Sequence, residues 1–505
     1  MSLPAFVPAL AAALSGAAAV LAFAPFGWFV VGWLAMAGLF TLLRRAPTTR
    51  RGALVGFAFG CGWFGAGTSW VYVSLSVFGG LPPAMAALST ALFCAALALF
   101  PALVGALFVR WRRPGFVAEA VFFTALWTLG EWLRGWLFTG FPWLSLGYSQ
   151  APPSPLAGLA PLFGVFGLSL AAAFVGACLA EALRRGLAAL SLRAALPLLP
   201  ALALIGAAWL LGEVRWTVPE GPPVKVALLQ GNVPQEMKWR PEKLTESLAI
   251  YDELMRAHPA TLTVLPETAI PAFLGELPSA YLERLLAHAE AQGGDLLFGV
   301  PVGDGVVYAN AAVSIGVSPS QIYSKSHLVP FGEFVPPGFR WFLDMMHIPM
   351  SNFTPGPAGQ PPLVIGGQKV AVNICYEDVF GEEIIAALPE ATLLLNLSNT
   401  AWFGDSLAQP QHLQIAQLRA LETGRPMLRA TNTGMTAVVG ADGRVQATLP
   451  PFTRAALVAE VSGHAGLTPY ARWGNVAVLL LCVALLVCAH LPWRFSPLPA
   501  ARKTK

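Results

Sequence analysis

Long apolar runs dominate the two ends of the chain and are absent from the part between them. A transmembrane helix needs about 20 mostly apolar residues, and seven such stretches precede residue 213, with an eighth near the C-terminus. Their approximate limits are 4–22, 27–43, 53–75, 85–108, 116–138, 160–182, 194–212 and 473–492. The pattern predicts a polytopic α-helical membrane bundle of eight transmembrane helices.

Between residues 213 and 472 the apolar runs are shorter and alternate with amphipathic stretches. Val224–Gln230, Thr261–Leu265 and Lys369–Ile374 are typical of buried strands, and 241–257 and 408–424 are typical of helices. Such alternation predicts an α/β sandwich with buried sheets. Further strands are expected at 295–301, 307–316, 392–396, 427–430, 436–439 and 456–461, and further helices at 278–292 and 381–388.

Four segments follow from this pattern. Residues 1–212 are expected to form a seven-helix membrane bundle, and 213–472 a separate α/β domain. Residues 473–493 would be the eighth transmembrane helix, and 494–505 a basic tail.

Composition agrees with this division. Of 505 residues, 56% are hydrophobic and 11% charged, whereas soluble domains carry roughly 25% charge. These values exclude a disordered chain, a nucleic-acid binder and an ordinary cytosolic enzyme. Residues 1–212 hold 11 arginines and three acidic residues, while 213–472 hold 16 basic and 24 acidic residues.

The basic residues also predict the orientation in the membrane. Fourteen of them lie in alternate loops and the C-terminal tail, and the opposite loops, at about 23–26, 76–84 and 139–159, hold none. Cytoplasmic loops are rich in Lys and Arg. We therefore expect a multi-pass protein of the bacterial inner membrane, with both termini cytoplasmic and 213–472 in the periplasm. The first stretch lacks a basic n-region and is interpreted as a retained helix, not a signal peptide.

Two charged residues stand out in the predicted bundle. Glu131 and Arg134 lie three positions apart, on one helix face. Charged side chains at membrane depth are expensive and are functional candidates, but an interfacial ion pair that fixes helix depth explains them equally well. Trp143 lies in the aromatic outer loop that follows, where it would face the outer domain. The helices hold too few charges for an ion-coupled transporter.

Cysteine positions point to a site in the outer domain. Five of the six cysteines lie in predicted membrane helices, and Cys375 is the only one within 213–472. A lone thiol in an oxidising compartment is a candidate nucleophile, although an inert buried thiol is the alternative. Glu267 also follows a strand-like segment, and Lys325 lies in the segment 323–333. These two residues could act as general base and oxyanion stabiliser. The alternative for each is an ordinary surface residue.

Three motifs around these residues resemble the signatures of the nitrilase, or carbon–nitrogen hydrolase, superfamily. They are LPETAIP at Glu267, YSKSHLVPFGEFVP at Lys325 and NICYEDVF at Cys375, in that order. The chain also resembles the bacterial apolipoprotein N-acyltransferase family in its membrane motifs FAPFGW, SWVYVSLSVFGG and GEWLRGWLFTGFPW, and in GNVPQEMKW, NTAWFGD and QHLQIAQLRALETGRP.

The resemblance implies an αββα nitrilase-like sandwich and a catalytic triad. Glu267 would be the general base, Lys325 the oxyanion stabiliser and Cys375 the nucleophile, with Glu333 as a supporting second carboxylate. Trp239, Tyr376 and Glu377 match further functional positions of the family, and Tyr376 would also supply an oxyanion N–H. Thr400 stands where the family usually has Asp.

The resemblance also implies a reaction with two lipid substrates. The sn-1 acyl chain of a phospholipid such as phosphatidylethanolamine would pass through a Cys375 thioester to the α-amino group of a diacylglyceryl apolipoprotein. We expect a monomer. We also expect that the reaction needs no metal or cofactor, since the seven histidines lack the spacing of metal ligands.

A segment rich in aromatic residues and methionine, 336–355, would form a lid over the site. Its lipid-contact candidates are Trp341, Phe342, Met345 and Met346. A loop packed against the domain core is the alternative interpretation.

Two other functions fit part of the sequence. A membrane-tethered amidase would use the same triad and resolve the thioester with water. A transporter or scaffold whose outer domain only binds would retain its function without Cys375.

Overall fold

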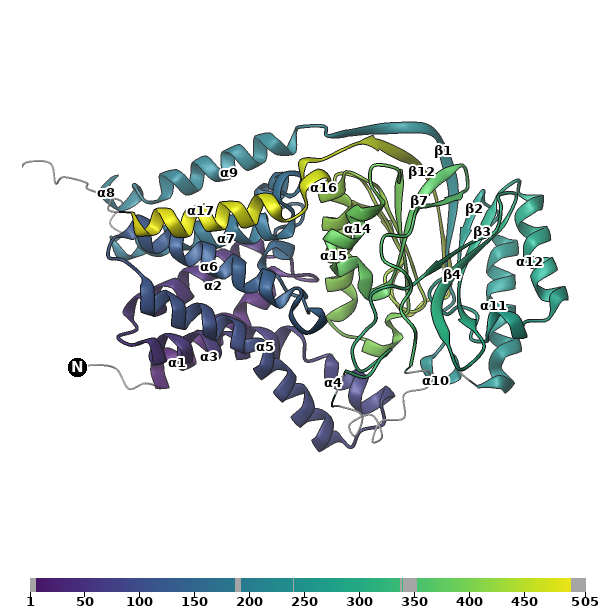
Figure 1. Cartoon of the computed structure of the whole chain (residues 1–505), viewed down its shortest axis with the longest axis horizontal. Coiled ribbons are helices and arrows are strands. Elements are labelled where there is room, and N and C mark those ends of the chain that lie inside the picture. The colour runs from purple at the N-terminus through teal and green to yellow at the C-terminus, as the bar shows by residue number, and fades with distance from the viewer. Residues whose placement is uncertain (1–5, 187–191, 239, 337, 339–351, 492–505) are drawn as a thin grey trace, which may run out of the picture.

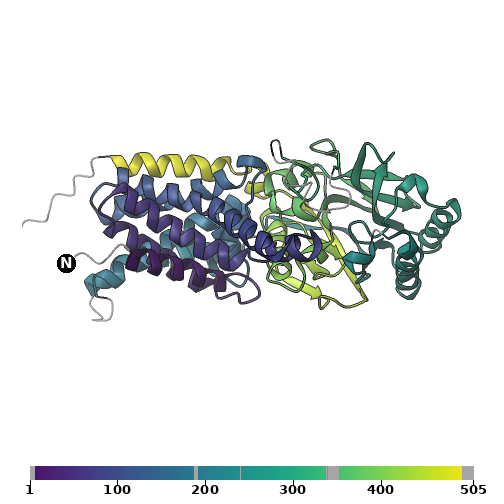
Figure 2. The ribbon, with the colours of Figure 1, turned by 90° about the horizontal axis from the view of Figure 1, so that it is seen from below.

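The computed structural model describes residues 6–186, 192–238, 240–336, 338 and 352–491. The molecule is elongated, with a helical bundle at one end and an α/β domain at the other (Figures 1 and 2).

In the described chain eight long helices form the bundle, and most of them run along the long axis of the molecule (Figure 1). They are α1 (Phe6–Ala19), α2 (Phe29–Arg45), α3 (Thr49–Gly67), α5 (Pro83–Trp111), α6 (Phe116–Arg134), α7 (Ala160–Arg184), α9 (Leu198–Gly212) and α17 (Val476–His490). The shorter α4 (Val71–Val73), α8 (Leu192–Ala195) and α16 (Pro469–Trp473) lie at their ends. The C-terminal α17 packs on α6 and α7, although the whole α/β domain separates them in sequence.

Three helical segments of the described chain are long and apolar enough to cross a membrane: Pro83–Trp111, Phe116–Arg134 and Pro155–Arg184. The apolar helices Phe6–Ala22, Leu198–Gly212 and Val476–His490 are shorter. Helices are thus found at all eight predicted positions, and the number that span a membrane stays a prediction.

Two predicted helix ends are wrong. The stretch 53–75 does not form one helix, because α3 ends at Gly67. The helix in the stretch 116–138 ends at Arg134, and the backbone leaves the helical region at Trp136, which has a φ of −135°, and at Phe138, which has a φ of 56°.

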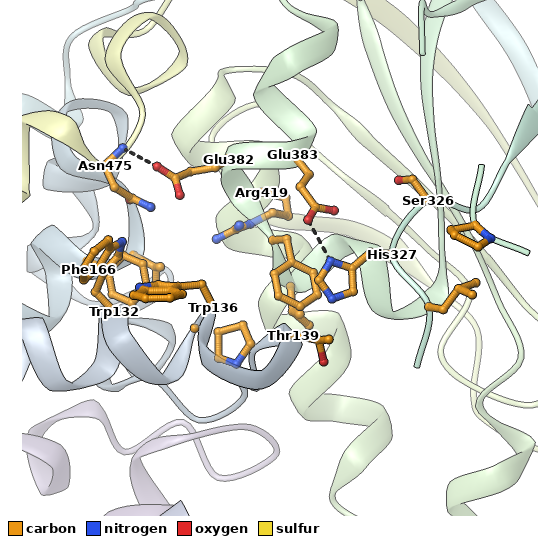
Figure 3. Close-up of a pocket in the computed structure, with 18 of the residues that line it drawn as sticks. Trp132, Trp136, Thr139, Phe166, Ser326, His327, Glu382, Glu383, Arg419 and Asn475 are labelled. Atoms are coloured by element: carbon orange, nitrogen blue, oxygen red, sulfur yellow. Dashed lines mark hydrogen bonds and ion pairs between the residues drawn. The ribbon is translucent and has the colours of Figure 1, made fainter. Parts of the chain in front are cut away.

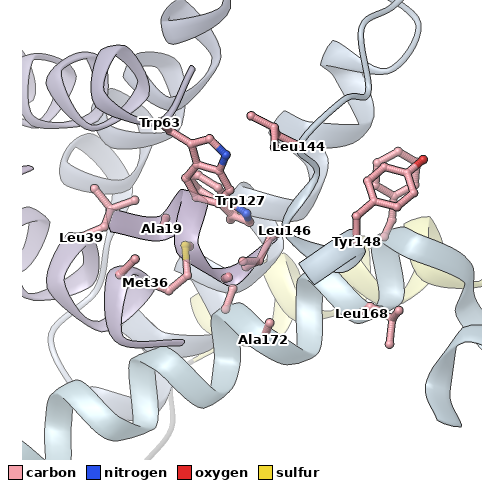
Figure 4. Packing of buried hydrophobic residues seen from close by; sticks show 14 of the residues in the cluster. Ala19, Met36, Leu39, Trp63, Trp127, Leu144, Leu146, Tyr148, Leu168 and Ala172 are labelled. Carbon is pink, nitrogen blue, oxygen red and sulfur yellow. The ribbon is translucent and has the colours of Figure 1, made fainter. Parts of the chain in front are cut away.

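Aromatic rings and close backbone contacts fill the bundle interior. Trp63 of α3 packs against Trp127 of α6 with ring centroids 5.5 Å apart (Figure 4). A Cβ added at Gly56 would lie 2.1 Å from the carbonyl oxygen of Pro101 on α5. Small residues of this kind allow membrane helices to pack closely.

The α/β domain contains two six-stranded sheets. The first has the order β12-β1-β2-β3-β4-β5 and the second β11-β10-β9-β8-β7-β6. In the first, β1 (Thr217–Gln230), β2 (Leu262–Val264) and β3 (Asp295–Gly303) are mutually parallel, and β4 (Tyr308–Gly316), β5 (Gln321–Ser324) and β12 (Ala455–Gly466) complete the sheet. In the second, β7 (Gln368–Ile374), β8 (Leu393–Ser398) and β9 (Met427–Thr431) are parallel, flanked by β6 (Leu363–Ile365), β10 (Ala437–Val439) and β11 (Val445–Thr448).

Helices cover the outer face of each sheet. The helices α11 (Leu244–Ala257) and α12 (Ser279–Ala291) pack on the first sheet, and α15 (Ala408–Thr423) packs on the second. Buried residues such as Leu228, Leu297 and Leu395 fill the space between the sheets. The predicted sandwich with two buried sheets is confirmed, and the strands β5, β6 and β11 were not expected.

The second sheet and its helices face the bundle, and α15 contacts α7 directly. Two further short α-helices of the domain, within its described residues, are α10 (Gln235–Lys238) and α14 (Gly381–Ile384).

Candidate active site

Cys375 lies at the carboxyl end of β7, where a short 3₁₀ turn, Cys375–Val379, begins. Its φ of 54° is in the left-handed region, which a residue with a side chain seldom adopts. Such strained positions are concentrated at functional sites. Its carbonyl oxygen accepts a hydrogen bond of 3.1 Å from Asn396 of the neighbouring strand, and the residue is 8% exposed. The backbone therefore holds this thiol in a fixed position at the end of the parallel sheet.

Glu267 and Lys325 come from the opposite sheet and meet in the interior. Glu267 follows β2 and Lys325 follows β5, so the facing sheets bring the catalytic candidates together. The ammonium of Lys325 lies 3.4 Å from Oε1 of Glu267 and 2.8 Å from Oε1 of Glu333. All three of these side chains are buried.

Two further groups position the carboxylates. Asn310 of β4 donates to Oε1 of Glu267 at 2.8 Å and to Oε1 of Glu333 at 3.0 Å. The backbone N–H of Asn399 donates to the other oxygen of Glu267 at 2.7 Å. The following residue, Thr400, is buried. Asn310 could not be found from the sequence, because it lies inside a strand with no adjacent motif.

The electrostatics of the cluster keep the thiol protonated and the lysine charged. Burial raises the pKa of Cys375, and the charge of Glu267 raises it further, against the opposing effect of Lys325. Burial alone would lower the pKa of Lys325, but Glu333 and Glu267 reverse this and hold it above its usual value. A thiol in this state needs a base at the moment of attack, and Glu267 has the largest effect of the nearby carboxylates on the pKa of this thiol.

Glu377 connects the segment of Lys325 to the turn of Cys375. Its Oε1 accepts hydrogen bonds from the backbone N–H groups of Ser326 and His327, at 2.7 and 3.1 Å, and from the Ser326 hydroxyl. Its Oε2 accepts from the N–H of Ile374 and the hydroxyl of Tyr323, at 2.6 and 2.9 Å. Burial raises the pKa of Glu377, while these N–H donors oppose the shift.

Tyr376 and Trp143 lie at the junction of the domain and the bundle. The hydroxyl of Tyr376 donates to the carbonyl oxygen of Gly140 at 3.0 Å. The indole N–H of Trp143 donates to the side chain of Gln411 on α15 at 2.8 Å. The loop that carries Trp143 therefore contacts the α/β domain through this hydrogen bond.

Glu131 and Arg134 have separate partners. Glu131 accepts from the N–H of Leu146 at 2.8 Å, and Arg134 donates to the carbonyl oxygens of Phe141 and Trp143. Within the described chain, the ion pairs closer than 4 Å do not include one between these two residues. Both instead hold the outer loop that carries Trp143.

Lys238, which the sequence did not single out, is a second buried lysine at the site. It ends α10, is 2% exposed, and donates to the carbonyl oxygen of Glu267 at 3.1 Å. Burial lowers the pKa of Lys238 to about 7. Its neighbour Trp239 lies outside the described residues, as do the lid candidates Trp341, Phe342, Met345 and Met346. The motif GNVPQEMKW was the one available signal for Lys238.

A hydrogen-bonded network that the sequence also missed supports the nucleophile from behind. Asp378 contacts His412 at 2.7 Å and Arg429 at 2.8 Å, and Arg429 donates to Asn396, which holds the carbonyl of Cys375. In the described part of the chain, no group of three His, Cys, Asp or Glu side chains is placed to hold a metal ion.

The two facing sheets and the Glu, Lys and Cys that they bring together define a carbon–nitrogen hydrolase domain. Residues 225–470 match the family described as carbon–nitrogen hydrolase. Residues 15–178 match a second family, described as the apolipoprotein N-acyltransferase N-terminal domain.

Curated relatives extend the match over nearly the whole chain. An apolipoprotein N-acyltransferase from Nitrosomonas europaea is 50% identical, with 95% of this chain and 97% of the relative covered. One from Ralstonia nicotianae is 47% identical, with 95% and 92% covered. Among solved structures, a CN-hydrolase superfamily protein from Xanthomonas campestris aligns with 53% of this chain and 96% of its own, at 16% identity and a TM-score of 0.38.

The chain belongs to the apolipoprotein N-acyltransferase family. It is an acyltransferase of the carbon–nitrogen hydrolase superfamily, and its family implies phospholipid and lipoprotein substrates. The family resemblance predicted from the motifs is confirmed, and the amidase alternative is not favoured.

Proposed function

We propose that the protein transfers the sn-1 acyl chain of a phospholipid to the α-amino group of a diacylglyceryl apolipoprotein through a thioester on Cys375. The observation that carries this proposal is the buried cluster of Glu267, Lys325 and Glu333 around the lone thiol of the α/β domain. The cluster supplies the base and the cation that an acyl transfer at a thiol requires.

In the first stage, Glu267 takes the proton of Cys375 as the sulfur attacks the ester carbonyl carbon. The negative charge that develops on the carbonyl oxygen is stabilised by the ammonium of Lys325 and the backbone N–H of Tyr376. When the tetrahedral intermediate collapses, the bond to the glycerol oxygen breaks and Glu267 returns the proton to that oxygen. The products are the acyl thioester and a lysophospholipid.

In the second stage, the neutral α-amino group of the lipoprotein attacks the thioester carbonyl. Glu267 takes a proton from the attacking nitrogen and returns it to the sulfur of Cys375 as the C–S bond breaks. The thiol is restored and the amide is released, so the cycle is ping-pong and needs no cofactor.

Supporting residues orient these groups. Glu333 shares the ammonium of Lys325 at 2.8 Å, which fixes the position of that charge. Glu377 holds the segments of Lys325 and Cys375 in register, and Tyr376 ties the nucleophile's turn to the bundle. The roles of Trp239 and of a lid at Trp341, Phe342, Met345 and Met346 are part of the same proposal.

We also propose that the protein is a monomer that crosses the inner membrane eight times. Residues 1–212 and 473–493 would form the spans, and 213–472 would lie in the periplasm, with residues 494–505 in the cytoplasm. The asymmetry of basic residues between alternate loops supports this topology. Both lipid substrates would then be held in the outer leaflet beside the site.

The transferase and the amidase differ in the nucleophile that cleaves the thioester, which is an amine in the first and water in the second. Purified protein is mixed with acyl-labelled phosphatidylethanolamine and a diacylglyceryl peptide, and label on the peptide amine is measured against free fatty acid. We expect the label on the peptide, and none with Cys375→Ala. Release of fatty acid alone, at a rate unaffected by the peptide, would support the hydrolase and overturn the proposal.

A further inference from the structure

A cavity of about 520 Å³ lies between the outer end of the bundle and the α/β domain (Figure 3). Its lining comes from the end of α6, from α7, from the α16–α17 junction and from the segments of the domain next to the catalytic residues. Cys375, Glu267 and Lys325 are not part of the lining. The volume is within the range of small-molecule sites.

Several residues that line the cavity are close in sequence to the catalytic residues. Ser326 follows Lys325, Phe334 follows Glu333, and Val379 ends the turn that begins at Cys375. The cavity therefore borders the segments that carry the catalytic residues and does not include those residues themselves.

Aromatic rings form much of the wall. Trp132 and Trp136 come from the bundle, and Phe380 from the domain stacks on His327 with ring centroids 3.7 Å apart. Trp136 is 51% exposed. Trp side chains are common where a protein meets the lipid headgroups, and aromatic faces attract ammonium groups.

The charged groups of the cavity are mainly acidic. Oε1 of Glu383 lies 2.8 Å from Nδ1 of His327, and Oε1 of Glu382 accepts from the N–H of Asn475 at 3.3 Å. No described residue donates to the second oxygen of either carboxylate. The guanidinium of Arg419 is already in a buried ion pair with Glu422. It therefore does not neutralise the charges of Glu382 and Glu383.

Asn475 adds a buried acceptor to the cavity. It is 3% exposed and lines the cavity, and its Oδ1 has no hydrogen-bond partner within the described residues. A buried acceptor without a donor is costly. A ligand with N–H donors would satisfy it.

We propose that this cavity binds the ethanolamine ammonium of the donor phospholipid, with Glu382, Glu383 and Asn475 as acceptors and the aromatic rings as its walls. The proposal rests on the proposed acyl transfer and assigns the selection of the donor headgroup to a place outside the catalytic cluster.

The separation between cavity and thiol favours the donor over the acceptor as occupant. The α-ammonium of the lipoprotein becomes the attacking amine, so it must reach the thioester on Cys375 itself. The ammonium of phosphatidylethanolamine is joined to the reacting ester through the phosphate and glycerol, so it can occupy a neighbouring cavity during attack.

The test compares phosphatidylethanolamine with phosphatidylglycerol of identical acyl chains, in detergent micelles without acceptor. The rate of thioester formation on Cys375 is measured for the wild type, for Glu382→Gln, for the double variant Glu382→Gln/Glu383→Gln, and for the control Glu390→Gln, which changes an exposed carboxylate elsewhere in the domain. Charge-assisted hydrogen bonds are worth about 1.5–3 kcal/mol, or roughly 10- to 100-fold.

We expect the double variant to raise about 10-fold the phosphatidylethanolamine concentration that gives the half-maximal rate of thioester formation, at the weaker end of that range. The maximal rate and the values for phosphatidylglycerol should not change. The single variant should show a smaller rise, and Glu390→Gln none. An equal loss with both lipids, or no change with either, would overturn the proposal. Absence of any thioester in the wild type would instead refute the proposed function, so the two failures are distinguishable.

Discussion

Two regions of this molecule bury a cation, and they surround it differently. In the α/β domain, the ammonium of Lys325 contacts the carboxylates of Glu333 and Glu267. At the end of the bundle next to the α/β domain, the guanidinium of Arg134 contacts the carbonyl oxygens of Phe141 and Trp143 and the hydroxyl of Ser145. Lys325 is therefore part of a charged cluster, whereas Arg134 holds a loop in shape.

The first cation lies among the groups proposed to take part in the reaction, and the second helps to fix how the domain contacts the bundle. The charges in this cluster act on the pKa of the Cys375 thiol, which Glu267 and Glu333 raise and Lys325 lowers. The partners of Arg134 are mostly backbone groups, and Trp143 in the loop that it holds reaches Gln411 of the domain. We expect changes at the first cation to alter the reaction, and changes at the second to alter how the domain is seated.

Replacing Lys325 with methionine should have the largest effect. The developing oxyanion loses its cation, and two buried carboxylates lose their partner. Loss of one oxyanion donor costs about 10²–10³-fold in rate, so thioester formation, measured with labelled phospholipid, should fall at least that far. Lys369→Met, at an exposed position of the same domain, is the control. A variant that keeps a tenth of the rate would contradict the assigned role.

Glu377→Gln should come next. The amide retains one acceptor oxygen in place of two, and its NH₂ group would oppose the N–H donors of Ser326 or Ile374. We expect a fall of about 10- to 100-fold in kcat for thioester formation, as a few kcal/mol of misplaced hydrogen bonds imply. The matched control is the exposed Glu290→Gln. Full activity at a lowered melting temperature would mean that Glu377 only stabilises the fold.

Arg134→Lys should have a smaller effect of another kind. Lysine keeps the charge but lacks the planar fork that reaches several oxygens at once. We expect a lower melting temperature and a loss of activity of about 10-fold, corresponding to roughly 1.4 kcal/mol, with an unchanged pH profile. The exposed Arg113→Lys serves for comparison. A shifted pH profile would instead place Arg134 in the chemistry.

Lys238→Met should have the smallest effect on rate and a distinct effect on pH dependence. The pKa of Lys238 is lowered to about 7, so above pH 7 the folded protein releases a proton that the unfolded chain still holds. The contribution of Lys238 to the stability of the wild type therefore increases as the pH rises from about 7 toward the pKa that this lysine has in the unfolded chain. Below pH 7 Lys238 is charged in the folded protein, so the full free-energy cost of burying that charge applies.

The measurement is the melting temperature of both proteins at pH 6 and pH 9. The difference, wild type minus Lys238→Met, should be larger at pH 9, by an amount equivalent to about 2–3 kcal/mol. The exposed Lys225→Met gives the baseline. A difference independent of pH would show that Lys238 does not titrate in this range.

Much of this arrangement could be predicted from the sequence. Strands such as Lys369–Ile374 have continuous apolar runs, and the motifs at Glu267 and Cys375 follow strands that were predicted. Asn310 and Asp378 were missed as partners because their roles depend on which strands become neighbours. The edge strand β5 is half exposed and only four residues long, so its pattern was too weak to predict.

The bundle was harder to predict in detail. Apolar runs located its helices, but hydropathy does not show where an apolar helix stops, as at Gly67 and Arg134. The partners of Glu131 and Arg134 depend on the conformation of the loop that follows. Spacing on one helix face suggested an ion pair, and nearby backbone groups bind each residue instead.

A two-step chase experiment tests the thioester on Cys375 most directly. The protein is incubated with acyl-labelled phosphatidylethanolamine, freed of lipid, digested and analysed by mass spectrometry, and a second portion is mixed with a diacylglyceryl peptide. We expect one acyl group on the peptide that contains Cys375, sensitive to hydroxylamine, absent in Cys375→Ala and transferred to the amine in the chase. Acyl transfer by Cys375→Ala at the wild-type rate, or no acyl-enzyme while transfer proceeds, would contradict it.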